Sequence, residues 1–258
     1  MKKTGIYDVI ERENVKVLNP KLLKVITNPN PKIYSQFEVT KEMVECDILI
    51  NLPKLKTHTL AYMTCAEKNF FGLIYGLNKS GWHAKASTHL EFSEAINDLY
   101  GALLETLEGK PILNICDGIL GLEGEGPSSS GIPKKANAIL MSNDAVSLDY
   151  IACKLVKLDE EKIYITNNAH NRGLGCADIN NITLIGDSLD LFADISFLAP
   201  KDSLSHIGLR ILKIKPIRNI VLEHPKIDHT KCIKCGECVK ICPPKTMKIE
   251  KYYRVNYI

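Results

Sequence analysis

Four cysteines crowded into eleven residues near the C-terminus constrain this chain more than any other feature. They follow the spacing C-x2-C-x2-C-x3-C-P, with Gly236 between the second and the third. Thiolates are the soft ligands that iron–sulfur clusters require, and this spacing lets one short loop turn several sulfurs toward one centre. The glycine allows the backbone to lie close to the inorganic sulfurs. The spacing therefore predicts a 4Fe–4S cluster bound by Cys232, Cys235, Cys238 and Cys242.

Zinc is the other metal that cysteine pairs at this spacing can bind. Zinc ribbons use two separated C-x2-C pairs, whereas the five cysteines outside this run stand singly. The run is instead the one typical of bacterial ferredoxins, which bind cubane clusters through cysteine thiolates. We therefore expect residues 223–258 to form a small ferredoxin-like module.

The role of the fourth cysteine is open. In ferredoxins with two clusters the fourth cysteine of each run binds the other cluster, and this chain contains one run. Cys242 therefore closes the same cluster, remains unused or serves a partner. The final residues KYYRVNYI resemble the link between two such runs, so we expect residues 223–258 to be half of a two-cluster module. If Cys242 is not a ligand, a cysteine of the body could supply the fourth thiolate. The alternative for each of these cysteines is the role of a small, buried apolar residue. The five are Cys46, Cys65, Cys116, Cys153 and Cys176.

Cysteine usage and apolar patterning indicate a reducing compartment. Nine cysteines, four of them in one run, do not form the even, spread framework of a secreted disulfide-bonded protein. The N-terminal residues MKKTGIYDVIEREN contain no apolar segment typical of a secretory signal. No apolar run approaches the roughly 20 residues that span a bilayer. We expect a cytoplasmic protein without a membrane partner.

Charge is distributed unevenly along the chain. Residues 201–258 contain 13 basic and 5 acidic residues, whereas the rest of the chain contains 20 and 25. A basic surface can steer an acidic partner toward the module. The alternative is that these lysines keep a small module soluble and offset a negatively charged cluster. The basic segment lacks the interleaved aromatic residues of nucleic-acid-binding surfaces, so we expect no nucleic-acid partner.

Hydrophobic periodicity indicates that residues 1–200 form an α/β body, followed by a connecting region at 201–222. The expected elements are a buried strand at 45–52, a helix at 92–107, strands at 111–116 and 136–141, a helix at 144–158 and a last strand at 182–185. Strands that alternate with helices predict a mostly parallel sheet with flanking helices. Residues 117–131, rich in glycine, are expected to form a loop.

Three polar segments of the body contain residues capable of chemistry. In the first, NLPKLKTH, Lys54, Lys56 and His58 alternate, so an extended backbone places them on one face, where they could hold an anionic group. The alternative is a solvated loop, because lysine is mostly exposed. The third, DGILGLEGEGPSSSG, places Asp117 and Glu123 among glycines that could form an anion-binding nest, although it matches no nucleotide-binding motif.

The second polar segment, residues 67–92, combines basic and aromatic side chains. His83 and His89 could act as metal ligands or as acid–base groups. Their spacing of six residues fits no simple helical metal pair, so the spacing by itself is a weak signal. The other notable residues of this segment are Lys68, Asn69, Phe70, Phe71 and Trp82.

Taken in order, these segments resemble a protein family known as domain of unknown function 362. The resemblance rests on LPKLKTH, KNFFGL, a G-x-H stretch, a DGI-x-G-x-EG-x-GP segment and a D-A-V-x-x-D helix start, here at residues 52–58, 68–73, 81–83, 117–127 and 144–149. Many members of that family end in ferredoxin-type runs, often two. Members usually begin further upstream, so the resemblance implies that residues 1–200 are N-terminally incomplete.

Two classes of function fit these observations. In the first, the protein is a redox enzyme that binds a small anionic substrate through Lys54, Lys56, His58 and Glu123, and exchanges single electrons with a redox partner protein through the cluster. Candidates for its catalytic groups are His58, Asp117 and His83. In the second, the protein is a non-catalytic electron carrier or a docking scaffold, which needs no cleft of converging polar residues. A redox sensor ranks last, because no output module is visible.

Overall fold

The structure is a computed structural model that describes residues 5–18, 22–74, 88–127 and 130–201, together with Cys235 and two short strands near the C-terminus. These two strands, β8 (Met247–Ile249) and β9 (Val255–Tyr257), pair antiparallel. The remaining cluster cysteines lie outside the described residues, and so do His83 and Trp82.

The main sheet is built around one long central strand, β6 (Ile112–Gly124). One edge of β6 pairs in parallel with two short strands that follow each other, β3 (Leu49–Asn51) and β4 (Lys54–His58). The other edge pairs antiparallel with β7 (Gly131–Ser142), and β5 (Tyr62–Thr64) pairs antiparallel with β4. The body is therefore α/β, as expected, but the sheet is mixed rather than mostly parallel.

Strands β3 and β4 act as one strand interrupted at Pro53. The carbonyl of Pro53 accepts the N–H of Asp117 at 2.9 Å, so the ladder along β6 continues across the interruption. Proline has no N–H to contribute, which accounts for the break between the two short strands. The register then shifts between Lys54, opposite Asp117, and Lys56, opposite Leu122.

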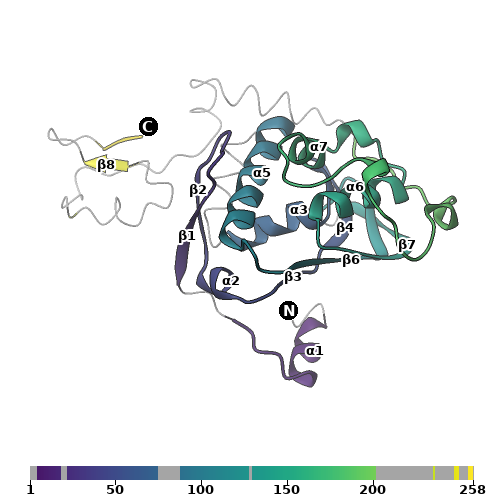
Figure 1. Ribbon diagram of the computed structural model, residues 1–258, viewed down its shortest axis with the longest axis horizontal. Helices are drawn as coiled ribbons and strands as arrows, with labels where there is room; N and C mark the ends of the chain where they lie inside the picture. Colours follow the sequence, from purple (N-terminus) through teal and green to yellow (C-terminus); the bar gives the residue numbers. More distant parts are fainter. Residues whose placement is uncertain are drawn as a thin grey trace.

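Helices cover one face of this sheet, as Figure 1 shows. The longest, α5 (His89–Thr106), begins with a capping box in which Thr88 and Glu91 exchange hydrogen bonds with each other's backbone. The helix α6 (Ala145–Leu155) is capped by Asp144, whose carboxylate accepts the N–H groups of Val146 and Ser147. These two helices confirm the helices predicted at 92–107 and 144–158.

Shorter helices complete the helical layer. They are α3 (Ala66–Asn69), α7 (Tyr164–Asn171) and the 3-10 helices η2 (Phe70–Leu73), η3 (Glu160–Lys162), η4 (Ile179–Asn181) and η5 (Leu189–Phe192). The helix α2 (Lys41–Glu45) precedes β3, whereas α1 (Ile6–Arg12) buries none of its residues.

A separate hairpin of β1 (Leu23–Thr27) and β2 (Gln36–Thr40) packs against α5 (Figure 1). The loop between its strands is fixed by Asp98 of α5, which is fully buried. The Asp98 carboxylate accepts the backbone N–H groups of Lys32, Ile33 and Tyr34 at 2.7–2.9 Å. The buried charge is thus satisfied by several donors, which is what makes its burial tolerable.

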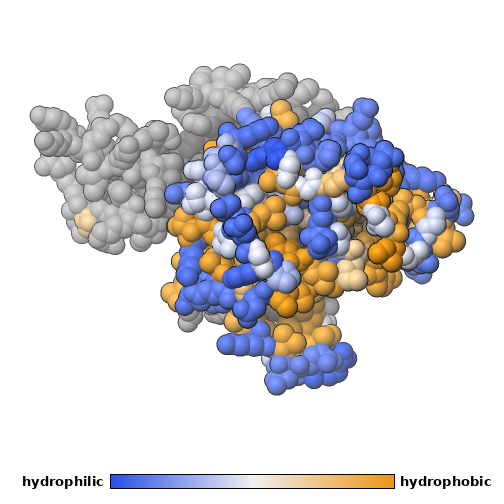
Figure 2. All heavy atoms as spheres, in the orientation of Figure 1, coloured by the Kyte–Doolittle hydropathy of each residue, from blue (hydrophilic) through white to orange (hydrophobic). Residues whose placement is uncertain are grey.

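The opposite face of the sheet exposes apolar side chains. Ile50 on β3 is 55% exposed, and Ile139 and Met141 on β7 are 65% and 67% exposed. Figure 2 shows apolar residues at the surface on this side of the body. The prediction that 45–52 forms a buried strand is therefore wrong about burial, because helices cover β3 on one face only.

Two further expectations are corrected. Residues 117–131 are not a loop, because β6 runs to Gly124 and β7 begins at Gly131, so most of the segment forms a hairpin. The strand expected at 182–185 is absent from the described residues, where the chain leaves η4 without regular structure and Ile185 is 94% exposed.

Two glycines, Gly121 within β6 and Gly126 just after it, are needed for close packing. A Cβ at Gly121 would overlap the ring of Phe197 at 2.7 Å and lie 3.0 Å from the carbonyl oxygen of Leu55. A Cβ at Gly126 would overlap the carbonyl oxygen of Thr57, whose hydroxyl also donates to the carbonyl of Gly124 at 2.7 Å. These glycines let the end of β6 lie directly against β4.

Replacing Gly126 by alanine is expected to destabilise the body by on the order of 1–3 kcal/mol, because a backbone oxygen has to move to accept the new methyl group. Chemical denaturation of the purified protein measures this change in the free energy of unfolding. Gly72→Ala is the control, since its Cβ meets nothing within 4 Å among the described residues. Equal stability of the two variants would contradict the packing argument.

Candidate functional site

The structure pairs two of the predicted site residues directly. The ammonium of Lys54 on β4 lies 2.6 Å from the carboxylate of Asp117 on β6, which is its partner in the strand register. The hydrogen bond from Lys54 lowers the pKa of Asp117, although both side chains are about half exposed. Exposed pairs of this kind contribute little to stability. The lysine charge is therefore already neutralised locally by Asp117.

Lys56 shares the same face of β4 and is half-buried. It stands opposite Leu122 on β6 and Thr64 on β5, in the middle of the sheet. Among the residues that the structure describes, Lys56 makes no ion pair. Of the two lysines predicted to bind an anion, Lys54 pairs with Asp117, whereas Lys56 has no carboxylate partner among the described residues.

His58 is buried at the end of β4 and organises the turn that follows. Its Nδ1 accepts the backbone N–H groups of Leu60 and Ala61 at 3.0 and 3.1 Å. Its ring stacks on Phe92 of α5, with centroids 6.5 Å apart and planes at 22°. With Nδ1 acting as an acceptor, neutral His58 carries its proton on Nε2.

Lys68 and His89 join the same region from two other elements. The ammonium of Lys68 lies 4.7 Å from the ring centroid of Phe71 and 5.4 Å from that of Phe92. The ring of His89 donates from Nδ1 to the carbonyl oxygen of Leu60 at 2.5 Å. Residues of the LPKLKTH and KNFFGL segments therefore meet around Phe92.

Glu123 lies apart from the lysines. It follows Leu122, the register partner of Lys56, so its side chain points to the opposite face of β6 and is buried. Its carboxylate accepts the N–H of Leu198 at 2.9 Å and so holds the segment after residue 195 against the strand. The structure does not bring Glu123 together with Lys54 and Lys56.

Two buried asparagines, Asn51 and Asn114, belong to a chain of hydrogen bonds that the sequence reasoning missed. Asn51 at the end of β3 donates to Asn114 of β6 at 2.8 Å and to the carbonyl of Ala66 at 3.0 Å. Asn69 donates to Asn51 at 2.7 Å, and Asn114 donates to the carbonyl of Ser142 at 3.1 Å. The signal was present in the sequence, because Asn51 and Asn114 each interrupt an otherwise apolar strand.

Asp149 of α6 is a second buried polar group that the sequence reasoning did not single out. Its two carboxylate oxygens accept the N–H groups of Ala66 and Glu67, the first residues of α3, at 2.6 and 3.1 Å. Burial raises the pKa of Asp149 to about 7, although these backbone hydrogen bonds and one from the Cys65 thiol favour the charged form.

Glu67 lies beside Asp149 and is fully buried. Its Oε2 accepts the hydroxyl of Thr166 at 2.7 Å, while Oε1 has no hydrogen-bond partner among the described residues. Burial raises the pKa of Glu67 well above its usual value, and the charge of Asp149 raises it further. Two carboxyl groups in one dry environment cannot both ionise without cost.

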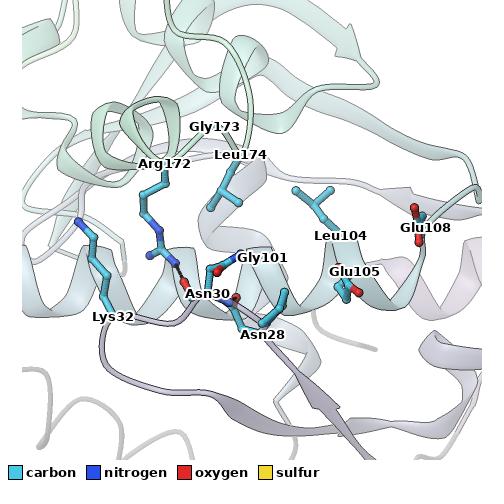
Figure 3. Close-up of a pocket in the computed structure, with 11 residues that line it drawn as sticks. Asn28, Asn30, Lys32, Gly101, Leu104, Glu105, Glu108, Arg172, Gly173 and Leu174 are labelled. Carbon is cyan, nitrogen blue, oxygen red and sulfur yellow. Dashed lines mark hydrogen bonds between the residues drawn. The ribbon is translucent and has the colours of Figure 1, made fainter.

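An open pocket of about 540 Å³ lies on another side of the body, between α5, the loop after β1 and the end of α7 (Figure 3). Arg172 lines it with a side chain that is 9% exposed and bound to Glu94 at 3.0 Å and to Asp98 at 2.7 Å. These carboxylates hold the guanidinium in place. None of the predicted site residues that the structure describes lines this pocket.

The C-terminal cysteine run is the metal-binding candidate that the sequence provides. In the described part of the body, no group of three histidine, cysteine, aspartate or glutamate side chains is placed to hold a metal ion. The run itself provides four thiols within eleven residues, and the described member, Cys235, is exposed and free. Thiolates are soft ligands, so this set of four fits a cubane cluster. Three body cysteines are fully buried, as expected of small apolar residues: Cys65, Cys116 and Cys153.

The two buried carboxyl groups lead to a prediction about pH. A carboxyl group whose pKa is raised on folding keeps a proton that the unfolded chain has already released, so the folded state binds more protons between about pH 4 and 7. The free energy of unfolding is therefore expected to fall as the pH rises through this window. Denaturant titrations at pH 5, 6, 7 and 8 measure it, and a rise from pH 5 to 8 would contradict the assignment.

Replacing Glu67 by glutamine is expected to stabilise the body at pH 8 by on the order of 1–3 kcal/mol and to flatten its pH dependence. Glutamine removes the charge and keeps an oxygen that can accept from Thr166. The matched control is Glu161→Gln, which makes the same chemical change at an exposed position. If both variants show the same pH dependence, the buried carboxyl group is not the source of it.

Comparison with known proteins yields matches for both parts of the chain. The family model described as "Domain of unknown function (DUF362)" matches residues 1–154, and the model described as "4Fe-4S binding domain" matches residues 224–248. The thylakoid-associated protein sll1697 of Synechocystis sp. is 34% identical over 131 residues, which are 50% of this chain and 39% of that protein. The chain thus covers less than half the length of this relative. No solved structure matches the chain. None of the described helices is long and apolar enough to cross a membrane.

Proposed function

Because this chain belongs to the DUF362 family and contains a 4Fe–4S binding domain, we propose that it is an iron–sulfur protein that transfers single electrons to or from a redox partner protein. The observation that carries the proposal is the cysteine run at 232–242, which lies within the matched residues 224–248. A bound 4Fe–4S cluster supplies one-electron chemistry. Cys232, Cys235, Cys238 and Cys242 are the proposed ligands.

The charge distribution supports a protein as the electron partner. The residues from 201 onward carry a clear excess of basic side chains, whereas the preceding body is mildly acidic. Such an asymmetry orients an acidic partner toward the basic end during encounter, and salt weakens this steering. The nine cysteines, four of them in one run, do not form the even framework of a disulfide-bonded secreted protein, which supports a reducing location such as the cytoplasm.

A small anionic ligand of the body is the second candidate function. The observation that favours it is Lys56, a half-buried lysine without a described carboxylate partner, next to the Lys54–Asp117 pair and on the strand that ends at His58. Glu123, which points to the other face, is left out of this revised site. If this ligand exists, the protein is an enzyme or a ligand-gated carrier. Without it, the body is a docking unit for the partner.

Anaerobic reconstitution with iron and sulfide tests the main proposal. A self-sufficient cluster is expected to contain about four irons for each chain and to undergo a reversible one-electron reduction. Electron paramagnetic resonance monitors this reduction. Cys242→Ala is expected to leave a three-iron or labile cluster, while Cys176→Ala serves as the control. An intact four-iron signal in Cys242→Ala would assign the fourth ligand elsewhere, and a protein that binds no iron would overturn the proposal.

Lys56→Ala tests the anionic ligand. The variant is expected to weaken binding of small carboxylates or phosphate by on the order of 1–3 kcal/mol, the cost of losing one charged hydrogen bond. Isothermal titration calorimetry against a panel of such anions measures the change. Lys24→Ala, which removes an exposed lysine from the separate β1–β2 hairpin, is the control. If the wild type binds none of the anions, or both variants bind equally, the site assignment fails.

A further inference from the structure

Two buried cysteines of the body touch each other. The sulfur of Cys65 lies 3.3 Å from the sulfur of Cys116, although the two residues are 51 positions apart in the sequence. Both side chains are fully buried. Sulfur atoms at this distance need to move little more than 1 Å to reach the length of a disulfide bond, about 2.05 Å.

The surrounding structure holds each partner from its own side. Cys65 precedes α3, whose first two N–H groups are bound by Asp149, so the residues that follow the thiol are fixed. Cys116 lies inside β6, opposite Leu140 of β7. The contact is therefore a product of the sheet and of the α6–α3 connection rather than of a flexible surface loop.

The thiols of the three other body cysteines donate to backbone carbonyls instead. Cys153 is equally buried, but its thiol donates to the carbonyl of Leu158 at 3.4 Å. Cys46 and Cys176 donate to the carbonyls of Met43 and Asp178 at 3.0 and 3.7 Å. In the described part of the chain, the sulfur–sulfur contact of Cys65 and Cys116 thus distinguishes this pair from the other body thiols, which are buried or half-buried singly.

We propose that Cys65 and Cys116 form a redox-active dithiol that closes reversibly into a disulfide when the protein meets a small peroxide. One sulfur takes an oxygen atom from hydrogen peroxide as the O–O bond breaks, giving a sulfenic acid and one water. The second sulfur attacks the first, the S–S bond forms, the S–O bond breaks and the second water leaves. Two thiols lose two electrons and two protons, and the peroxide gains them as two waters.

Asp149 stands where a proton acceptor is needed. The Cys65 thiol is hydrogen-bonded to the Asp149 carboxylate, and burial raises the pKa of this thiol well above its usual value. The Cys65 thiol is therefore kept neutral at rest and is not a constitutive nucleophile. Transfer of the Cys65 proton to Asp149 gives the thiolate that reacts with the oxidant, so the oxidation is coupled to this carboxylate.

Closure of the disulfide would join the start of α3 to the centre of the sheet. The helix α3 carries Lys68 and Asn69, the residues that contact Phe92 and Asn51. Oxidation also removes the S–H group that donates to Asp149. The bond would thus fix the segment that bears the KNFFGL motif. This inference concerns the body only and does not depend on the proposed electron transfer through the C-terminal module.

Peptide mapping of the reconstituted protein tests this inference. The protein is treated with stepwise equivalents of hydrogen peroxide, remaining thiols are alkylated, and linked peptides are quantified by mass spectrometry with and without dithiothreitol. The expected result is a Cys65–Cys116 linked peptide at least ten-fold more abundant than any other link between body cysteines. Dithiothreitol should restore both thiols. The Cys153→Ser variant, which removes an equally buried thiol, should form the same link.

Several outcomes would overturn the proposal. They are alkylation of both Cys65 and Cys116 after peroxide treatment that oxidises other thiols, formation of the link only under denaturing conditions, and a link that dithiothreitol does not reverse. Cys65→Ser and Cys116→Ser should each abolish the link, and circular dichroism checks that they fold. Because the decisive measurement uses the wild-type chain, misfolding of a variant leaves it intact. Iron counts from the same samples report the state of the module separately.

Discussion

Asp149 places a carboxylate inside the body, where its oxygens accept the first two N–H groups of α3. A helix start leaves such donors without partners, and burying them unpaired would cost more than the hydrogen bonds themselves contribute. One side chain of α6 therefore decides where α3 begins. The position of α3 in turn sets the places of Cys65, Glu67, Lys68 and the Asn51–Asn69 contact. The D-A-V-x-x-D motif thus contains two capping residues. Asp144 caps the start of α6, and Asp149 caps the start of α3.

The sequence was most informative where the signal is local. Apolar periodicity predicted the helices now seen as α5 and α6, and the cysteine spacing predicted the cluster module that the family comparison supports. The prediction of a loop at residues 117–131 is wrong, because the glycines on which it rests lie mostly in strands or at their ends. In the structure Gly118 and Gly121 lie inside a strand, where Leu55 and Phe197 occupy the space a side chain would need. Local patterns cannot distinguish a glycine that frees the backbone from one that makes room for a distant neighbour.

The same limit applies to the candidate site. Alternation on β4 placed Lys54 and Lys56 on one face correctly, since that depends only on the period of an extended strand. The partner of Lys54, however, comes from β6, and the burial of His58 and Glu123 depends on Phe92 and on the segment near Leu198. These pairings join residues about 30 to 75 positions apart. No periodicity contains that information, and only the family order of the motifs indicated that the segments belong together.

The way β6 is paired also bears on how the chain reaches this structure. Its antiparallel partner β7 follows after a short connection, so this hairpin can form early and from local contacts. Its parallel partners β3 and β4 lie more than 60 positions earlier, as the 63-residue separation of Asn51 and Asn114 shows. Closing so long a loop costs entropy before the pairing returns any free energy. We therefore expect the hairpin to serve as the template on which the interrupted strand docks, and the docking of β3 and β4 to limit the rate of folding.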